Sequence, residues 1–239
     1  MIKRNLILLI MLKILLIIPL EAKSYLFQDN FESRASPLWS NSIGNWTTSG
    51  GVYYAQQPSN NPVTYTSLPF ILTDFEVSFD MNNIRDGGIF LRSSFNPLNN
   101  HISGVYLVLG GFGGTGTGMY WQVSHDEIPT SLPWYNEVSG LFSPGGVSDA
   151  NIKIVVSGNL YSAYVNNNPI PATSFYNNEF SSGMVALYDY GVFLQTERQS
   201  FDNFKLDGSP VPIPGAALLI GTGIVRLAIY RRSKLTVKN

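Results

Sequence analysis

The sequence FEVSFDM at residues 75–81 decides the fold. Its apolar residues occupy every second position, and its polar residues occupy the positions between them. Successive side chains of a β-strand point to opposite faces, so this alternation predicts a strand with one face in a core and the other in water. Strands of this kind are typical of antiparallel sheets that bury one face.

A second alternating stretch is followed by a turn. Ile152, Ile154 and Val156 occupy alternate positions before Ser157-Gly158-Asn159, and another alternating run spans 161–165. Glycine and asparagine tolerate the positive φ of tight turns, so we expect an antiparallel hairpin. Turn residues also separate other short apolar runs, and we expect strands near residues 52–55, 88–94, 104–109, 118–125, 183–188, 191–195 and 200–207.

Residues 25–209 show no sustained 3.6-residue apolar period of the kind that an amphipathic helix has. Many short strands without crossover helices predict an all-β domain, an antiparallel two-sheet jelly-roll sandwich. The length suits one such domain. Two stretches rich in Asn, Pro, Gly and Ser, 95–103 and 126–150, are expected to be long surface loops, where binding sites are commonly built.

The N-terminal segment, residues 1–24, is expected to lie outside the domain. Lys3 and Arg4 precede an apolar run, 6–20, and small residues follow at Ala22-Lys23-Ser24. This order is typical of a secretory signal peptide, a helix that is removed on export. We expect cleavage after Ser24 or after Ala22, and a retained N-terminal anchor is the alternative.

The C-terminal segment, residues 210–239, has the layout of a membrane-retention signal. An apolar run at 216–230 predicts a transmembrane helix, and the residues that flank it are Val211, Pro212, Ile213, Pro214, Arg231 and Arg232. The tail resembles the PEP-CTERM class of bacterial sorting signals, in the variant with Val-Pro-x-Pro. The resemblance implies recognition by an exosortase, membrane insertion before processing, and delivery to the cell surface or extracellular matrix of a bacterium. An ordinary tail anchor that is never cut is the alternative.

Composition limits the chemistry and the partners of the domain. The chain has no cysteine, so disulfides, thiolate metal sites and cysteine nucleophiles are excluded. Between residues 25 and 209, six Lys and Arg oppose fifteen Asp and Glu, which gives a net charge of −9. Nucleic acids and anionic membrane surfaces attract basic proteins, so neither is expected to bind this domain. Neutral sugars and cations are compatible with its charge.

Several short strings resemble, in their order along the chain, the concanavalin A-like lectin/glucanase domains, especially the LamG-like and 3-keto-disaccharide hydrolase branch. The strings are LFQDNFE at 26–32, GNW at 44–46, GGVY at 50–53, FEVSF at 75–79, GIFLRS at 88–93, IKIVVSGN at 152–159, VALYD at 185–189 and FDNFKL at 201–206. The resemblance implies a jelly roll whose concave face binds glycans.

The same resemblance indicates a binding site on the concave strands and a nearby loop. Aromatic rings stack on the apolar faces of sugars, and a charged group fixes their orientation. The side chains expected to contact a glycan are Arg92, Trp121, His125, Trp134, Tyr188 and Asp189. Because Tyr120 and Trp121 are neighbours on one strand, one of them must point inward, and the alternative for Trp121 is that it fills the core.

A structural calcium ion is also implied, near Asp29 and Asp202. These residues lie on the first and last strands, which are expected side by side, and some relatives hold calcium near that place. Calcium prefers oxygen ligands such as carboxylates. The alternative is that each aspartate caps a turn. No other cofactor is expected.

The sequence supports catalysis less strongly than it supports carbohydrate binding. Asp74, Glu76 and Asp80 share one strand face, on which residues two apart, such as Asp74 and Glu76, are about 6.6 Å from each other, a spacing that suits two-carboxylate glycoside hydrolysis. That face is the solvated one, where nothing raises a pKa. His125-Asp126-Glu127 is interpreted as a polar cluster at a loop edge. We expect a carbohydrate- or matrix-binding protein without catalysis; the alternatives are a glycoside or 3-keto-glycoside hydrolase and a structural matrix protein without a ligand.

Overall fold

A computed structural model describes residues 25–59, 62–111, 117–127, 133–142, 148–190 and 198–211. The expected signal segment, nearly all of the expected sorting tail and the expected strand near 191–195 lie outside these residues. Within the described ranges, no helix is long and apolar enough to cross a membrane.

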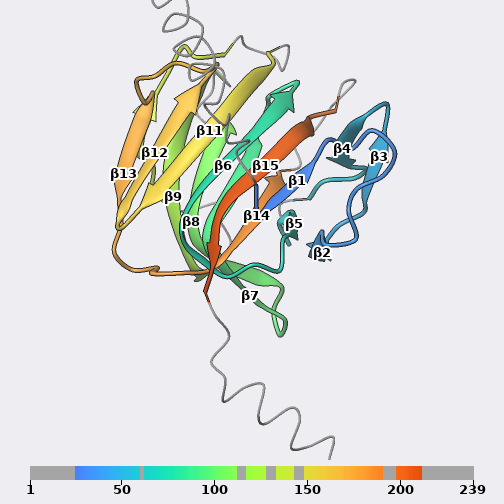
Figure 1. Ribbon diagram of the computed structural model, residues 1–239, viewed down its shortest axis with the longest axis horizontal. Coiled ribbons are helices and arrows are strands. Elements are labelled where there is room, and N and C mark those ends of the chain that lie inside the picture. The colour runs from blue at the N-terminus through green and yellow to red at the C-terminus, as the bar shows by residue number, and fades with distance from the viewer. Residues whose placement is uncertain are drawn as a thin grey trace, which may run out of the picture.

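The described residues form two antiparallel sheets, one in front of the other in Figure 1, which confirms the expected all-β sandwich. The first sheet has the order β13 (Thr173–Tyr176), β12 (Leu160–Val165), β11 (Ala150–Ser157), β6 (Leu72–Asn82), β15 (Ser200–Pro210), β4 (Val52–Ala55) and β3 (Trp46–Ser49), and β1 (Phe27–Asp29) pairs with β15. The second has the order β10 (Tyr135–Val138), β9 (Gly118–Glu127), β8 (His101–Gly110), β7 (Gly87–Asn96), β14 (Met184–Asp189), β5 (Thr64–Ser67) and β2 (Ser40–Ile43).

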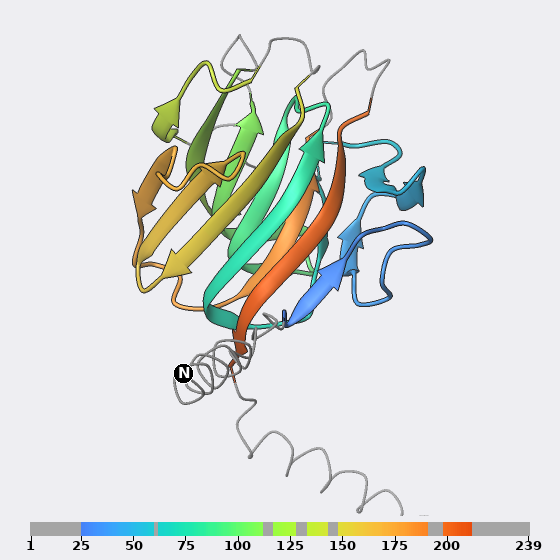
Figure 2. The same ribbon diagram turned by 45° about the horizontal axis from the view of Figure 1, so that its top comes forward.

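The stretch that predicted the fold forms the centre of β6. Phe75, Val77, Phe79 and Met81 are buried, whereas the polar residues between them are half-buried. The strand pairs with β11 on one side and β15 on the other, as Figure 2 shows. The predicted hairpin joins β11 to β12, with Gly158 at a φ of 54° in its turn.

The second sheet is apolar on both of its faces. Val185 and Leu187 of β14 belong to the core between the sheets, whereas Ala186 and Tyr188 belong to a second cluster on the outer face of the sheet. We call this second group the outer-face cluster; its buried members are Val63, Tyr65, Phe90, Ile102, Tyr106, Val108, Tyr120, Ala186 and Tyr188. An antiparallel sheet that packs one face against a core can leave polar side chains on its other face. The buried apolar side chains on this outer face therefore require an explanation.

The expected long loops are shorter than the sequence indicated. β7 extends to Asn96 and β8 begins at His101, so most of the stretch 95–103 is strand. The stretch 126–150 contains β10, which pairs with β9. The asparagines of 95–103 predicted a long loop, but in the structure their side chains stabilise a short turn between two strands. Asn96 Oδ1 accepts from Leu98 N at 3.0 Å, and Asn99 Oδ1 accepts from His101 N at 3.0 Å.

Candidate functional site

Gln199 joins the ends of three elements at one end of the second sheet. Its Oε1 accepts from the main-chain N–H groups of Arg85, at 3.0 Å, and Asp86, at 3.2 Å, just before β7. Its Nε2 donates to Asp189 Oδ1, at the end of β14, at 3.3 Å. Tyr190 N donates to Asp86 O at 3.0 Å. These bonds hold two aspartates, Asp86 and Asp189, in fixed positions.

Both of these aspartates are buried, with exposed fractions of 6% for Asp86 and 2% for Asp189. Burial raises the pKa of Asp86 to about 7. Burial also raises the pKa of Asp189 well above its usual range, and the nearby charge of Asp86 adds to that rise. Within the described part of the chain, neither carboxylate has a Lys or Arg partner. The two groups are therefore acids without a counter-charge.

Three aromatic rings of the outer-face cluster pack against one another. Phe90 is 4.6 Å from Tyr106 and 5.0 Å from Tyr188 between ring centroids, and the two tyrosines meet edge to face at 5.8 Å. Burial, and then nearby groups that include Asp86, raise the pKa of both tyrosines. Their hydroxyl groups are buried and have no hydrogen-bond partner among the residues that the structure describes.

An exposed indole lies at the other side of the same face. Trp134, just before β10, is 43% exposed and stacks on Tyr120 with ring centroids 4.9 Å apart and an interplanar angle of 28°. Tyr120 is in turn part of the outer-face cluster. Trp134 therefore packs on the same outer-face cluster that contains Tyr106 and Tyr188.

The register of the sheet shows how these residues are spaced. Tyr120 pairs with Val108, Val108 with Gly88, and Gly88 with Tyr188, so the four form a row across β9, β8, β7 and β14. Strands lie about 4.8 Å apart, so Tyr120 and Tyr188 are separated by about 14 Å. Gly88 leaves the middle of the row without a side chain, and a Cβ there would lie 2.2 Å from Leu107 O.

Four of the six residues expected to bind a glycan are almost fully buried, Tyr188 and Asp189 among them, and the other two of the four, Trp121 and Arg92, are interior residues. Trp121 is fully buried between the sheets, with its ring parallel to that of Phe175 at 6.2 Å, so the alternative interpretation of this residue is right and no sugar can reach it. Arg92 is 3% exposed. Its guanidinium donates to Thr73 O at 2.6 and 2.8 Å, to Gly158 O at 2.7 Å and to Phe180 O at 2.9 Å. Arg92 therefore binds main-chain carbonyl groups.

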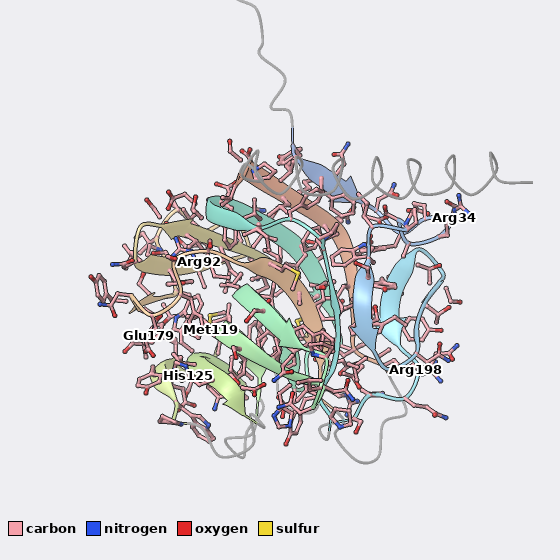
Figure 3. The ribbon with its side chains drawn as sticks, turned by 90° about the horizontal axis from the view of Figure 1, so that it is seen from below. Arg34, Arg92, Met119, His125, Glu179 and Arg198 are labelled. Carbon is pink, nitrogen blue, oxygen red and sulfur yellow. The ribbon has the colours of Figure 1, made fainter. Side chains whose placement is uncertain are left out.

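The expected residues other than Trp121 and Arg92 lie in three places. Tyr188 and Asp189 are adjacent on β14, at the end of the sheet that Gln199 joins. Trp134 lies before β10. His125, near the last residues of β9, is exposed; its Nε2 is 2.8 Å from Glu179 Oε2, and its ring stacks on Phe180 at 5.4 Å. Figure 3 shows His125 and Glu179 side by side. Asp189 is in register with Met119 through Gly87 and Leu109, so His125 lies six residues farther along β9, toward the other end of the sheet.

Asp29, one of the two expected calcium ligands, accepts hydrogen bonds from within the protein. β1 and β15 are side by side, as predicted. However, Asp29 accepts from Phe31 N at 3.0 Å, Ser36 N at 2.7 Å and Trp39 Nε1 at 3.1 Å. In the described ranges, no three His, Asp or Glu side chains are grouped as metal ligands. The contacts of Asp29 are those of the capping alternative.

We predict that Asp29→Ala lowers the free energy of unfolding by about 1–3 kcal/mol, because two N–H groups and one indole lose their acceptor. The loss should be equal with calcium and with a chelator, and the chelator should leave the melting temperature of the unchanged protein as it was. A calcium-dependent rise in the melting temperature that Asp29→Ala abolishes would instead support a calcium ion bound at Asp29. Thermal unfolding at matched ionic strength measures the stability loss of the variant and the effect of calcium on the melting temperature.

The acids of β6 are bound to neighbouring turns and strands. Asp74 Oδ1 accepts from Gly158 N at 2.7 Å. Asp80 accepts from Asn151 Nδ2 at 2.7 Å and from Asn203 Nδ2 at 2.8 Å. These are structural contacts on the solvated side of the first sheet. The acids whose pKa burial raises most, Asp86 and Asp189, lie instead at the end of the second sheet; the sequence analysis expected Asp189 at a binding site and did not expect Asp86.

Comparison with known proteins supports the fold and goes no further. No family model matches the chain, and no curated protein matches it. Among solved structures, a protein of unknown function with a galectin-like fold from Bacillus subtilis is similar, with a TM-score of 0.56 and 11% identity over 80% of this chain and 99% of the other. The carbohydrate-binding module CBM66 from Bacillus subtilis is also similar, with a TM-score of 0.52 and 11% identity over 72% of this chain and 96% of the other. The chain therefore shares the two-sheet β-sandwich fold of these proteins.

Proposed function

We propose that the protein binds carbohydrate on the outer face of its second sheet and leaves it intact. The observation that carries this proposal is the pair of Trp134 and Tyr120, an exposed indole stacked on a buried tyrosine that continues into an aromatic face. Indole and phenol rings pack against the C–H groups of sugars, and neighbouring polar groups bind the hydroxyls. The fold likeness to a carbohydrate-binding module agrees with this use of the sandwich.

We predict that Trp134→Ala weakens glycan binding about 30-fold, because removal of an aromatic anchor typically costs about 2 kcal/mol or more. The matched control is Tyr176→Ala, which removes another exposed ring, on β13 of the first sheet. A glycan array followed by calorimetry on the hits measures the effect. The proposal would be contradicted if Trp134→Ala bound the glycan as tightly as the unchanged protein, or if Trp134→Ala and Tyr176→Ala lost the same amount of glycan affinity.

A hydrolase is the second candidate, and one observation favours it. Asp86 is a buried carboxyl group with a pKa raised to about 7, which is the property of a general acid in glycoside hydrolysis. The same array hits should therefore be recovered and their chain lengths measured. Shortened products that are absent with Asp86→Asn would establish the hydrolase in place of the binding protein.

We further propose that the domain is exported by its N-terminal signal, residues 1–24, and sorted through its tail, residues 210–239. The layout of both segments supports this route to a bacterial surface or matrix, with a membrane-bound intermediate and an exosortase-type enzyme as partner. Intact-mass analysis of protein from the native host is the test. Surface protein that still carries residues 210–239 would contradict processing.

A further inference from the structure

We propose that one end of the sandwich rests on the lipid headgroups of the membrane that holds the tail, and that Ile71, Leu98 and Val211 are the side chains that enter the lipid. We call this end, where the described chain stops at Val211, the tail end. The inference rests on the proposed sorting tail and adds the orientation of the domain on the membrane. It depends on exposed apolar side chains at one end and on a short connection to the predicted transmembrane segment.

Two separate segments meet where β15 ends. Pro210 pairs with Leu72 of β6, and Val211 N donates to Ile71 O at 2.8 Å. The side chains of Ile71 and Val211 are nevertheless 43% and 38% exposed. Pro69 and Pro210 beside them are exposed as well. The end of β15 and the segment before β6 therefore present an apolar surface to the solvent.

The hairpin between β7 and β8 adds a third apolar side chain at this end. Leu72 and Gly183 exchange two main-chain hydrogen bonds, at 2.9 and 3.0 Å, just before β14. Met184 of β14 pairs with Ser93, and β7 continues for three more residues, which is about 10 Å. Figure 1 shows this hairpin and the end of β15 at the same end of the sandwich. Leu98, in the turn of the hairpin, is 94% exposed and adds to the apolar surface of the tail end.

The length of the connection places the tail end close to the bilayer. Only residues 212–215 separate Val211 from the apolar run at 216–230. Pro212 and Pro214 are two of these four residues, and a proline-rich segment spans about 3 Å per residue. Val211 therefore lies within about 15–18 Å of the predicted transmembrane segment. A headgroup layer is about 5–8 Å thick, so the remaining gap is about 10 Å at most, which the β7–β8 hairpin can bridge.

The short tether also makes a weak contact sufficient. A few apolar side chains hold a free domain on a membrane only weakly, because binding strength scales with the apolar area that is buried. A short linker converts their contact with lipid into an intramolecular event, at an effective concentration in the millimolar range. Once the tail is in the bilayer, transfer of these side chains from water to the lipid interface is therefore favourable.

Acidic side chains at the tail end determine which lipid fits. The side chain of Asp74, near the start of β6, is 64% exposed. Asp126 accepts from the side-chain amides of Asn96 and Asn99 beside the β7–β8 hairpin, and Glu179 is exposed before β14. These carboxylates repel anionic headgroups, whereas a zwitterionic headgroup carries an ammonium group that attracts them. We therefore expect the contact on zwitterionic lipid, without any need for anionic lipid.

The test uses the lack of cysteine in the chain, because a single introduced cysteine can carry a polarity-sensitive fluorophore. The full chain is incorporated into phosphatidylcholine vesicles with the label at Leu98→Cys, at Pro69→Cys or, as the matched control, at Ile170→Cys. Ile170 is 70% exposed and lies between β12 and β13, at the opposite end of the first sheet. The first two labels should emit at shorter wavelength and be quenched by brominated lipid. The control label should do neither.

A second set of variants tests the apolar side chains themselves. Ile71→Asp combined with Leu98→Asp should abolish the wavelength shift and the quenching of the label at Pro69→Cys. Ile170→Asp, which places the same charge at the opposite end, should leave both unchanged. These side chains are exposed, so thermal unfolding should show nearly equal stability in all variants.

Flotation of the vesicles separates the possible outcomes. A full chain that does not float with the vesicles would overturn both this inference and the proposed tail. A chain that floats while the labels at positions 69 and 98 remain in water would overturn the orientation and leave the sorting route intact. Labels that enter lipid only after phosphatidylglycerol is added would show attraction by charge, which overturns the apolar contact. Equal signals from all three labels would show adsorption without orientation, which also overturns it.

Discussion

Asp86→Asn is expected to raise the melting temperature at pH 8 and to leave it nearly unchanged at pH 4. The carboxyl group has its usual pKa of 3.8 in the unfolded chain and a pKa of about 7 in the fold, because burial disfavours its charged form. Between these values the folded protein binds more protons than the unfolded protein, so stability falls as pH rises. Above pH 7 the cost is constant, and below pH 4 it vanishes.

The size of this effect follows from the difference between the two pKa values. At about 1.4 kcal/mol per pKa unit, burial of the Asp86 carboxylate costs up to about 4 kcal/mol at pH 8. Asparagine has the same shape and no charge, so the variant should recover much of that amount. Denaturant unfolding at pH 4, 6 and 8 measures it. A variant that is less stable than the parent at pH 8 would show that a positive charge compensates Asp86.

Arg92→Met is expected to lower the free energy of unfolding by about 3–5 kcal/mol, because a buried group that loses its hydrogen-bonding partner is costly. The guanidinium is the donor to the carbonyl groups of Thr73, Gly158 and Phe180, which belong to three separate segments. Methionine keeps part of the volume and none of the donors. Stability should therefore fall at every pH.

The control for this variant is Arg34→Met, which changes an exposed arginine far from Arg92 (Figure 3). Surface substitutions typically change stability by no more than about 0.5 kcal/mol. Urea unfolding of the two variants at one pH gives the comparison. A loss below about 1 kcal/mol in Arg92→Met would mean that water replaces the guanidinium, and the assignment of Arg92 to the interior would need revision.

The sequence was sufficient for the fold because local patterns determine it. Alternation in β6 specified which residues are buried, and the turn at Gly158 specified an antiparallel neighbour. Of the strands on either side of this hairpin, β6 was expected from its alternation, whereas β13 was not expected. The lengths of the loops did not follow, because asparagine is as common in tight hairpins as in long loops.

The candidate site was less accessible to sequence reasoning. Tyr188, Asp189 and Trp134 were expected to contribute, but Trp121 and Arg92 were not distinguishable from surface residues by type alone. The choice between Tyr120 and Trp121 depended on which face of β9 points inward, a property set by the packing of the two sheets. Asp86 was missed because an aspartate before two glycines is typical of an exposed turn.

The position of β15 has a mechanical consequence. This strand has β6 on one side and β4 and β1 on the other, and just beyond its end Val211 N still donates to Ile71 O at 2.8 Å. Tension applied to the chain at residue 211 acts along the strand, across hydrogen bonds that lie perpendicular to it. Those bonds are loaded together in shear rather than opened one by one. A domain held by its C-terminal end while its second sheet grips a polymer should therefore resist pulling strongly.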